Sequence, residues 1–463
     1  MSAAAPAREF WSSRLGFVLA ASGSAVGLGS IWKFPYIAGV NGGGLFVVVY
    51  LACIALVAMP IMIAEILLGR ETRKAPVGAF RNAAGGSRGW SAIGWMGVVT
   101  GAIILSYYSV VAGWTLHYAW LGARGALRSA DPDAVATLFA RVHADPGVNL
   151  FWHAVFMTVV TLAVLGGVRK GVERWNRLLM PTLVALMCVL LARATTLDGF
   201  GRAVDFVFGL HAQDLTARGL LEALGHAFFT LSLGMGAMIT YGSYVASDED
   251  IVSSSVIVSG LDTLISLLAC LVVFPITFSF GLAPGAGPGL MFANLPIAFA
   301  QMPGGALWAA AFFLLLAVAA LASAISTLEV VVAHAIDELG WSRRRATLLM
   351  AGAIALLGVP SALSGGAGLF GAGFADLTTG VFGAGEGKNW FDFWDWVCAN
   401  LLLPAGGLGI AVFVAWRMGP AARERAFAQG SGWARWYWLW LWLLRWLVPL
   451  AIVAIFVNAL GVA

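Results

Sequence analysis

The residues best placed for polar chemistry lie in two apolar segments that are interrupted by glycines. They are SGSAVGLGSIWKFP, at residues 22–35, and FFTLSLGMGAMITYGSY, at residues 228–244. Glycine weakens a helix without ending it, so we expect each segment to unwind within a longer helix. Unwound backbone presents N–H and C=O groups without helical partners, which a membrane tolerates only beside other protein or a polar cavity. Paired breaks in repeated halves of a chain therefore predict a transport site.

Two acidic residues lie inside apolar stretches, where an ionised side chain is costly. They are Glu65 and Glu329. Acids in membrane helices are usually functional or held by polar partners. We expect Glu65 to accept hydrogen bonds from the unwound backbone of the second broken segment. We assign Glu329 only to a polar network in the core.

Composition identifies the class of protein. The chain has 463 residues, of which 60% are hydrophobic and 11% charged, with a mean hydropathy of +0.87, whereas a soluble domain carries about 25% charged residues. Apolar runs of about 20 residues recur without polar alternation, so they predict membrane helices rather than barrel strands. Nucleic-acid binding is not expected, because no basic patch is interleaved with aromatic residues. The four cysteines lack metal-type spacing and are expected to be buried free thiols.

Eleven spanning helices are predicted, which makes the chain an all-α integral membrane protein. Their approximate bounds are 13–40, 43–69, 91–123, 150–166, 171–193, 220–245, 251–281, 305–339, 342–363, 391–416 and 438–460. The first ten form two five-helix units that each open with a broken helix. An odd number of crossings gives the units opposite orientations, which is an inverted repeat. Helix eleven lies outside the repeat.

These spans divide the chain into six regions. They are an N-terminal gate segment at 1–12, the first repeat at 13–193, an extracellular loop at 194–219, the second repeat at 220–417, a cytoplasmic loop at 418–437, and helix eleven with the C-terminus at 438–463. The polar stretch 131–149 is expected to be a surface loop. The Gly- and Pro-rich stretch 284–304 contains MFANLPIAFAQM, which can form a short re-entrant helix over the site.

The distribution of lysine and arginine predicts the orientation in the membrane. Basic residues gather in loops on the same side as Arg8, and cytoplasmic loops are the ones enriched in them. These residues are Arg70, Arg73, Lys74, Arg81, Arg88, Arg169, Lys170, Arg343, Arg344, Arg345, Arg417, Arg423 and Arg425. The N-terminus is therefore expected in the cytoplasm and, after eleven crossings, the C-terminus outside. The N-terminal MSAAAPAREFW is not expected to be a cleavable signal.

Several long motifs together resemble one family, the neurotransmitter:sodium symporters. They are REFW at 8–11, GSAVGLGSIWKFPY at 23–36, NGGG at 41–44, KGVERWNRLLMP at 170–181 and the broken segment at 228–244. The resemblance runs from about residue 8 to residue 416. It implies the LeuT-type fold of bacterial amino-acid transporters, alternating access, and sodium-coupled uptake of amino acids or amines.

The resemblance also implies a substrate site around the first break. Backbone groups of Ala25, Gly27 and Gly29 would bind the substrate carboxylate, because half-helix ends offer donors and positive potential. Tyr108 matches the family tyrosine whose hydroxyl binds the same carboxylate. The pocket for the substrate side chain would be lined by Ile104, Val111, Phe229, Thr230, Ser232, Met235, Ser323 and Thr327. Met235 replaces a phenylalanine of the leucine-transporting relative, which suggests room for a large or aromatic side chain, although a methionine can also be a simple gap filler.

Two sodium sites are implied, and both depart from the family pattern. The first would use Ala25, Ser30, Thr230 and Asp262, with Ser30 and Asp262 each replacing an asparagine. A cation would compensate Asp262, although a salt bridge or a neutral buried acid are alternatives. The second would use Gly23, Val26, Ala319, Ala322 and Ser323, and Ala322 lacks the oxygen that the family often has there. A missing ligand should weaken the second site unless water replaces it.

A fixed charge at Asp262 has a consequence for chloride. In chloride-dependent members of the family a halide offsets the cation charge near the first site. The matching positions here are Tyr50, His226, Thr230 and Ser266. Since Asp262 would already be negative, a halide is redundant and we predict chloride independence. His226 replaces a family glutamine and is interpreted as structural, with titration as the alternative.

Gate residues are implied on both sides of the site. Lys33 and Asp395 match the extracellular ion pair, with Asp392 as a rival acid. Lysine cannot form the bidentate contact of the usual arginine, so this gate should be looser or water-bridged. Arg8 and Asp337 match the cytoplasmic pair, supported by Trp11 and Tyr244.

Taken together, the sequence predicts a secondary active transporter and no enzyme. The first hypothesis is a chloride-independent symporter that couples Na⁺, as one or two ions and with no organic cofactor, to neutral hydrophobic or aromatic L-amino acids. The second keeps the fold but couples to protons or to a single sodium ion. The third is a non-transporting amino-acid sensor. We expect a monomer or weak dimer in the lipid bilayer of a bacterial inner membrane, with no nucleic-acid partner.

Overall fold

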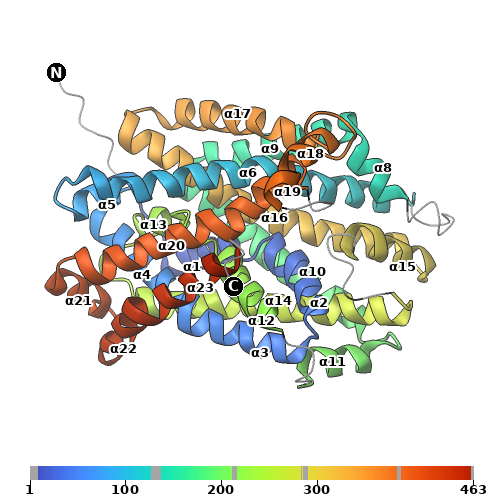
Figure 1. Cartoon of the computed structure of the whole chain (residues 1–463), viewed down its shortest axis with the longest axis horizontal. Helices are drawn as coiled ribbons and strands as arrows, with labels where there is room; N and C mark the ends of the chain where they lie inside the picture. The colour runs from blue at the N-terminus through green and yellow to red at the C-terminus, as the bar shows by residue number, and fades with distance from the viewer. Residues whose placement is uncertain are drawn as a thin grey trace.

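The computed structural model is helical throughout, and the residues that it describes contain no β-strand. Those residues are 9–126, 137–210, 216–282, 284, 290–382 and 387–459. Long helices lie roughly side by side, with shorter helical pieces between them (Figure 1). The prediction of an all-α membrane protein is confirmed.

Nine continuous helical stretches among the described residues are long and apolar enough to cross a membrane. In chain order they are α3–η2–α4 (Gly44–Thr72), α6 (Arg88–Ala123), α9 (Pro146–Leu165), η3–α10 (Val168–Ala194), α14 (Ile251–Ser279), α16 (Gly305–Leu339), α17 (Arg343–Ala362), α19–η5–α20–η6 (Trp390–Arg417) and η7–α22–η8–α23 (Ala434–Ala459). Each overlaps one predicted span, and the ends differ by a few residues because caps and turns set them locally.

The two remaining spans are the broken ones. Helix α1 (Arg14–Ala25) and the pair η1–α2 (Gly29–Val40) meet at a bend of 50° and together form a tenth span. Helix α12 (Ala217–Thr230) and helix α13 (Ala237–Gly242) are separated by six non-helical residues and occupy the place of the eleventh. Both interruptions fall where the glycines predict them, since glycine tolerates backbone that other residues avoid.

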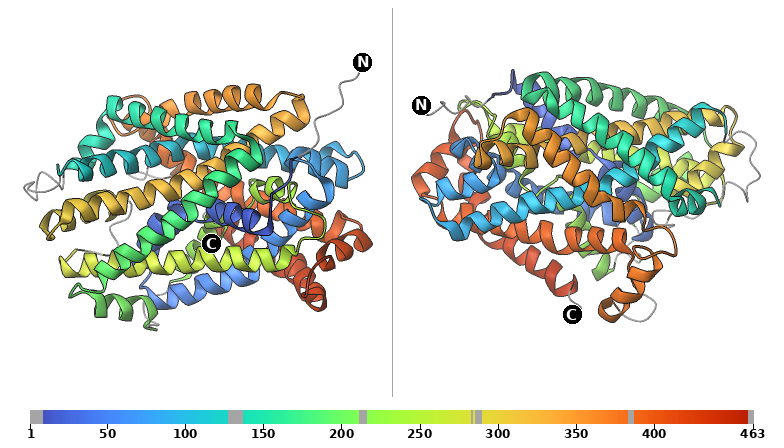
Figure 2. Two further views of the ribbon diagram at one scale, coloured as in Figure 1. Left: turned by 180° about the vertical axis from the view of Figure 1, so that it is seen from behind. Right: turned by 90° about the horizontal axis from the view of Figure 1, so that it is seen from above.

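Short helices gather at the two ends of the bundle. They are α5 (Pro76–Ala83), α8 (Leu138–Ala144), α11 (Phe200–Phe208), η4–α15 (Leu290–Gln301), α18 (Ala372–Phe382) and α21 (Pro420–Ala428). Figures 1 and 2 show α5 and α21 at one end and α8, α11 and α15 at the other. The predicted loop 131–149 contains helix α8, and residues 131–136 lie outside the described residues. The short helix expected within 284–304 is η4–α15, while 285–289 are not described.

Small residues let the central helices approach closely. A Cβ on Gly122 of α6 would lie 2.7 Å from the backbone nitrogen of Ala310 on α16. A Cβ on Gly113 would lie 3.0 Å from the backbone nitrogen of His153 on α9. Membrane helices associate through such close backbone contacts. The result is a rigid frame of α6, α9 and α16 against which the broken helices are held.

Candidate functional site

The two broken segments are tied directly to each other. The hydroxyl of Ser232 donates to the carbonyl of Ser24 at 2.9 Å. Ser232 has φ +54°, an uncommon value for a residue with a side chain, and Gly234 follows with φ +85°. The N–H of Gly234 donates to Oε1 of Glu65 at 2.8 Å, which confirms the role expected for that buried acid. Protein groups therefore satisfy the N–H of Gly234 and the carbonyl of Ser24, in the way that a membrane interior requires.

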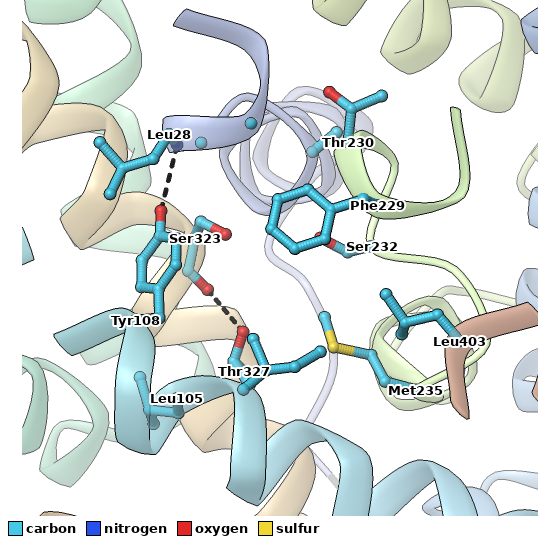
Figure 3. Close-up of a pocket in the computed structure, with 14 residues that line it drawn as sticks. Leu28, Leu105, Tyr108, Phe229, Thr230, Ser232, Met235, Ser323, Thr327 and Leu403 are labelled. Carbon is cyan, nitrogen blue, oxygen red and sulfur yellow. Dashed lines mark hydrogen bonds between the residues drawn. The ribbon is translucent and has the colours of Figure 1, made fainter. Parts of the chain in front are cut away.

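A central cavity lies between the two breaks. Its volume is about 30 Å³. The lining residues are Ala25, Gly27, Leu28, Gly29, Ile104, Leu105, Tyr108, Phe229, Thr230, Ser232, Met235, Ser323, Thr327 and Leu403. In Figure 3, Tyr108 lies across the cavity from Phe229 and Ser232, while Thr327 comes from the side of Tyr108 and Met235 from the opposite side.

Tyr108 is fixed by the first break. Its hydroxyl accepts a hydrogen bond from the N–H of Leu28 at 3.1 Å, within the unwound stretch (Figure 3). A Cβ on Gly27 would lie 3.1 Å from this hydroxyl and 3.1 Å from the hydroxyl of Ser323. Glycine at position 27 thus lets two hydroxyl groups approach the backbone. The arrangement concentrates donors at the point where a carboxylate would be recognised.

Replacing Tyr108 by phenylalanine is expected to weaken amino-acid binding by about tenfold. The hydroxyl accepts from the N–H of Leu28 and keeps its own proton to donate to a carboxylate, and a hydrogen bond to a charged group contributes about 1.5–3 kcal/mol. Equilibrium binding of labelled amino acid to the purified variant measures the effect. Tyr107 is the matched control, because it precedes Tyr108 on α6 but does not line the described central cavity. Equal affinities in wild type and Tyr108→Phe would exclude the hydroxyl from substrate binding.

Most, but not all, of the residues that line the central cavity were predicted from the sequence. Val111 is buried one turn beyond Tyr108 and is not among the described lining residues. Leu28, Leu105 and Leu403 line the cavity and were not singled out. The sequence does not distinguish a leucine that lines a cavity from a leucine that contacts lipid. The packing of the helices is needed to identify these three residues.

Asp262 is the centre of a buried cluster of oxygen atoms. Its carboxylate accepts hydrogen bonds from Ser30 at 2.5 Å and from Thr230 at 3.0 Å and 3.2 Å. The hydroxyl of Tyr50 donates to the same carboxylate at 3.3 Å. Ser30 also lies 3.4 Å from the carbonyl oxygen of Ala25. Asp262 and Ser30 are fully buried, so every polar atom here must find its partner within the protein.

The chemistry of this cluster suits a hard cation. A carboxylate, two hydroxyls and a backbone carbonyl converge from three different segments, and hard cations prefer oxygen ligands of this kind. The hydroxyls can rotate to offer lone pairs instead of protons. Among the described residues no cluster of three or more histidine, cysteine or acidic residues could hold a transition metal. The residues named for the first sodium site are therefore brought together.

His226 lies beside the cluster in an aromatic environment. Its ring stacks on Phe34 with centroids 5.6 Å apart and lies 5.7 Å from the ring of Tyr50. Neither ring nitrogen has a hydrogen-bond partner within the described part of the chain. Tyr50 links the residues named as anion-site equivalents, because its hydroxyl contacts Asp262, to which Thr230 also donates, while its ring packs near His226. Ser266 is buried one turn along α14 from Asp262.

The residues named for the second sodium site come from α1 and α16, which pack against each other. Gly23 and Val26 lie where α1 ends, and the last carbonyls of a helix have no later N–H to accept from. Val26, Ala319 and Ala322 are all fully buried. The side chain at Ala322 adds no oxygen, so this group contains the hydroxyl of Ser323 and backbone carbonyls.

An ion pair and a second, larger cavity lie on one side of the central cavity. Lys33 and Asp395 approach to 3.3 Å, so the pair uses Asp395 rather than its rival Asp392. The ammonium of Lys33 also lies 4.6 Å from the centroid of Phe229. The second cavity measures about 430 Å³ and includes Lys33, Phe229 and His226 in its lining. Phe229 lines both cavities, so its ring forms part of the partition between them.

A hydrogen-bonded network closes the opposite side of the central cavity. The backbone N–H of Trp11 donates to the carbonyl of Tyr244 at 3.1 Å, and its indole N–H donates to the carbonyl of Tyr241 at 3.0 Å. The hydroxyl of Tyr244 donates to Glu329 at 2.7 Å, and Glu329 pairs with Arg343 at 2.5 Å.

The predicted partner of Asp337 cannot be placed here. Arg8 lies outside the described residues, and Asp337 accepts from the backbone N–H of Ala75 at 2.7 Å. Sequence reasoning missed the role of Arg343, which it counted only among the basic loop residues. The clue was a buried acid, Glu329, that still needed a partner.

Comparisons with known proteins agree with this geometry. A model of the sodium:neurotransmitter symporter family matches residues 8–129 and 141–460. The chain is similar to the uncharacterized sodium-dependent transporter YhdH of Bacillus subtilis, with 37% identity over 453 residues and 98% of each chain covered. An uncharacterized sodium-dependent transporter of Haemophilus influenzae is 32% identical over 463 residues, again with 98% of each covered. The solved structure of MhsT in complex with L-phenylalanine is 42% identical with a TM-score of 0.87, covering 98% of this chain and 100% of that one.

Proposed function

Because this chain belongs to the sodium:neurotransmitter symporter family, we propose that it imports neutral hydrophobic or aromatic L-amino acids together with Na⁺. The chain is a sodium-dependent symporter with the LeuT-type fold and not an enzyme. The observation that carries the proposal is that one cavity is lined both by groups suited to a substrate and by a residue of the oxygen cluster around Asp262. Tyr108 and the unwound backbone face it on one side, and Thr230, which is bonded to Asp262, faces it on another.

The lining of the central cavity supports the proposed substrate class. Apart from Tyr108 and a few hydroxyls, the wall is apolar, so it favours an uncharged side chain. Met235 and Phe229 can rearrange to admit a larger one, because methionine is unbranched and flexible. The ligand in the structure of MhsT, L-phenylalanine, supports an aromatic substrate.

Coupling is proposed to run through sodium without chloride. In this proposal Asp262 is ionised and compensates the first ion, so the charge balance needs no halide. The second ion would bind at the end of α1 against α16, with Ser323 as its side-chain ligand. Coupling to protons or to one sodium ion is the alternative, motivated by the altered ligands Ser30 and Ala322. A sensor role is the third candidate, and no described feature favours it.

Alternating access would use the two closed sides described above. We place the Lys33–Asp395 pair and the second cavity outside, and the Trp11–Tyr244 network with Asp337 and Arg8 in the cytoplasm. The orientation rests on the lysine and arginine distribution, which puts the N-terminus inside and the C-terminus outside a bacterial inner membrane. A monomer or weak dimer with two repeats, 13–193 and 220–417, is the proposed unit.

The test is uptake of labelled tryptophan, phenylalanine, leucine and alanine into liposomes that contain the purified protein. We expect an inward Na⁺ gradient to drive accumulation of an aromatic or large aliphatic amino acid, unchanged when chloride is replaced by gluconate. Choline in place of Na⁺ should abolish it. Accumulation driven equally in choline by a pH gradient would favour proton coupling. Sodium-dependent binding without accumulation would favour a sensor.

Replacing Met235 by phenylalanine is expected to shift the ratio of affinities for phenylalanine and alanine by about tenfold toward alanine, since pocket size discriminates on that scale. The larger, stiffer ring would occupy space that the methionine side chain can vacate. Competition binding with both amino acids measures the ratio. Met235→Leu, of similar volume, should change it little. An unchanged ratio in Met235→Phe would show that another residue sets the pocket size.

A further inference from the structure

Asn176 presents a buried oxygen atom that makes no hydrogen bond in the described part of the chain. It lies on α10 (Arg174–Ala194) and is fully buried. Its Nδ2 donates to the carbonyl of Val172 at 2.9 Å, whereas its Oδ1 has no hydrogen-bond partner within the described residues. Leaving a buried acceptor unpaired is costly, so such a group calls for an explanation, and a bound ion is one.

The oxygen points at the group proposed for the second sodium ion. A Cβ on Gly23 would lie 2.0 Å from Oδ1 of Asn176 and 3.3 Å from the Cβ of Ala322. The amide oxygen and the methyl group of Ala322 therefore meet over the same face of Gly23. Glycine is required there, because any side chain would displace the amide. Asn176 thus stands next to the position where the side-chain oxygen is missing.

We infer that Oδ1 of Asn176 supplies to the second sodium ion the oxygen that Ala322 lacks. The inference rests on the proposed sodium coupling and assigns a ligand of that ion to a third helix, α10. An amide oxygen is a suitable neutral ligand for a hard cation. With carbonyls of Gly23 and Val26 and the hydroxyl of Ser323, it gives the ion an all-oxygen environment without a carboxylate.

This assignment predicts that an oxygen at position 322 can replace the oxygen of Asn176 as a ligand of the second sodium ion. Asn176→Ala should raise the Na⁺ concentration for half-saturation by about tenfold, the lower end of the effect of losing a group that supports a metal site. Ala322→Ser should restore most of the loss in the Asn176→Ala background, because it returns an oxygen over the same face of Gly23. Asn176→Asp, which keeps an oxygen at the same place, should retain Na⁺ binding.

The experiment is equilibrium binding of ²²Na⁺ to the purified full chain without amino acid, with thermal unfolding in choline as a measure of folding. The matched control is Asn400→Ala, because the amide of Asn400 also donates to a carbonyl four residues earlier, that of Trp396 at 2.9 Å. Asn400 lines the second cavity, away from Ala322. The Asn400→Ala variant should leave the Na⁺ concentration for half-saturation unchanged.

The outcomes separate this inference from the proposed function. Rescue of ²²Na⁺ binding by Ala322→Ser establishes the shared site. Unchanged Na⁺ binding in Asn176→Ala, beside normal binding in wild type, overturns the assignment alone. Weaker binding without rescue, accompanied by a lower melting temperature in choline, assigns Asn176 a structural role and also overturns it. A wild type that binds no Na⁺ would remove both proposals.

Discussion

Asp262→Asn is expected to weaken Na⁺ binding roughly hundredfold, the scale on which loss of a buried charged partner acts. The carboxylate is fully buried and accepts hydrogen bonds from Ser30, Thr230 and Tyr50. Asparagine keeps one oxygen at nearly the same place, so the fold and part of the ligand set should survive. What is lost is the negative charge that compensates the cation. The Na⁺ dependence of amino-acid binding to the purified variant measures this loss.

The same variant tests the reason for chloride independence. Without the charge at Asp262, chloride is expected to raise the remaining Na⁺-dependent binding, while wild type stays insensitive to chloride. The control is Asp250→Asn, since Asp250 caps the first turn of α14 through the N–H groups of Val252 and Ser253 and lies far along the helix from Asp262. Should Asp262→Asn bind Na⁺ as tightly as wild type, the buried acid would have to be neutral or structural. The first sodium site would then need a different centre.

Much of the fold was accessible from the sequence because membrane constraints are local. A span needs about 20 apolar residues, so its position can be seen in a single stretch of chain. The second break could be placed because its backbone needs glycine, since Gly234 and Gly236 have positive φ values. Glu65 could be assigned because an acid in an apolar helix must find donors, and unwound backbone offers them.

The rest depended on helix packing, which no single stretch of sequence contains. Asn176 looked like an ordinary part of a family motif until the structure showed its oxygen against Gly23. Leu403 lines the central cavity from a helix that begins at Trp390, nearly at the other end of the chain from the first break. Helix α8 was missed because its short sequence, LFARVHA, lies in a stretch with polar and charged neighbours.

Arg343→Ala is expected to destabilise the protein by about 3 kcal/mol, which is typical of removing one partner from a buried ion pair. Glu329 is fully buried, and its one remaining hydrogen bond among the described residues would be that from Tyr244. Since the carbonyl of Tyr244 holds the backbone N–H of Trp11, the loss should spread to the N-terminal segment. Thermal unfolding measures the stability, and hydrogen exchange of the peptide that contains Trp11 should accelerate.

The double variant distinguishes a paired charge from a loss of packing. Glu329→Gln together with Arg343→Ala should recover most of the stability, because the buried carboxylate that made the single variant costly is gone. Arg344→Ala is the matched control, since Arg344 is the exposed neighbour on the same turn of α17 and should have little effect. A double variant as unstable as Arg343→Ala would mean that the arginine acts through contacts other than Glu329. Recovery of stability with continued fast exchange at Trp11 would instead show that the ion pair itself, and not only charge balance, keeps this side of the transporter closed.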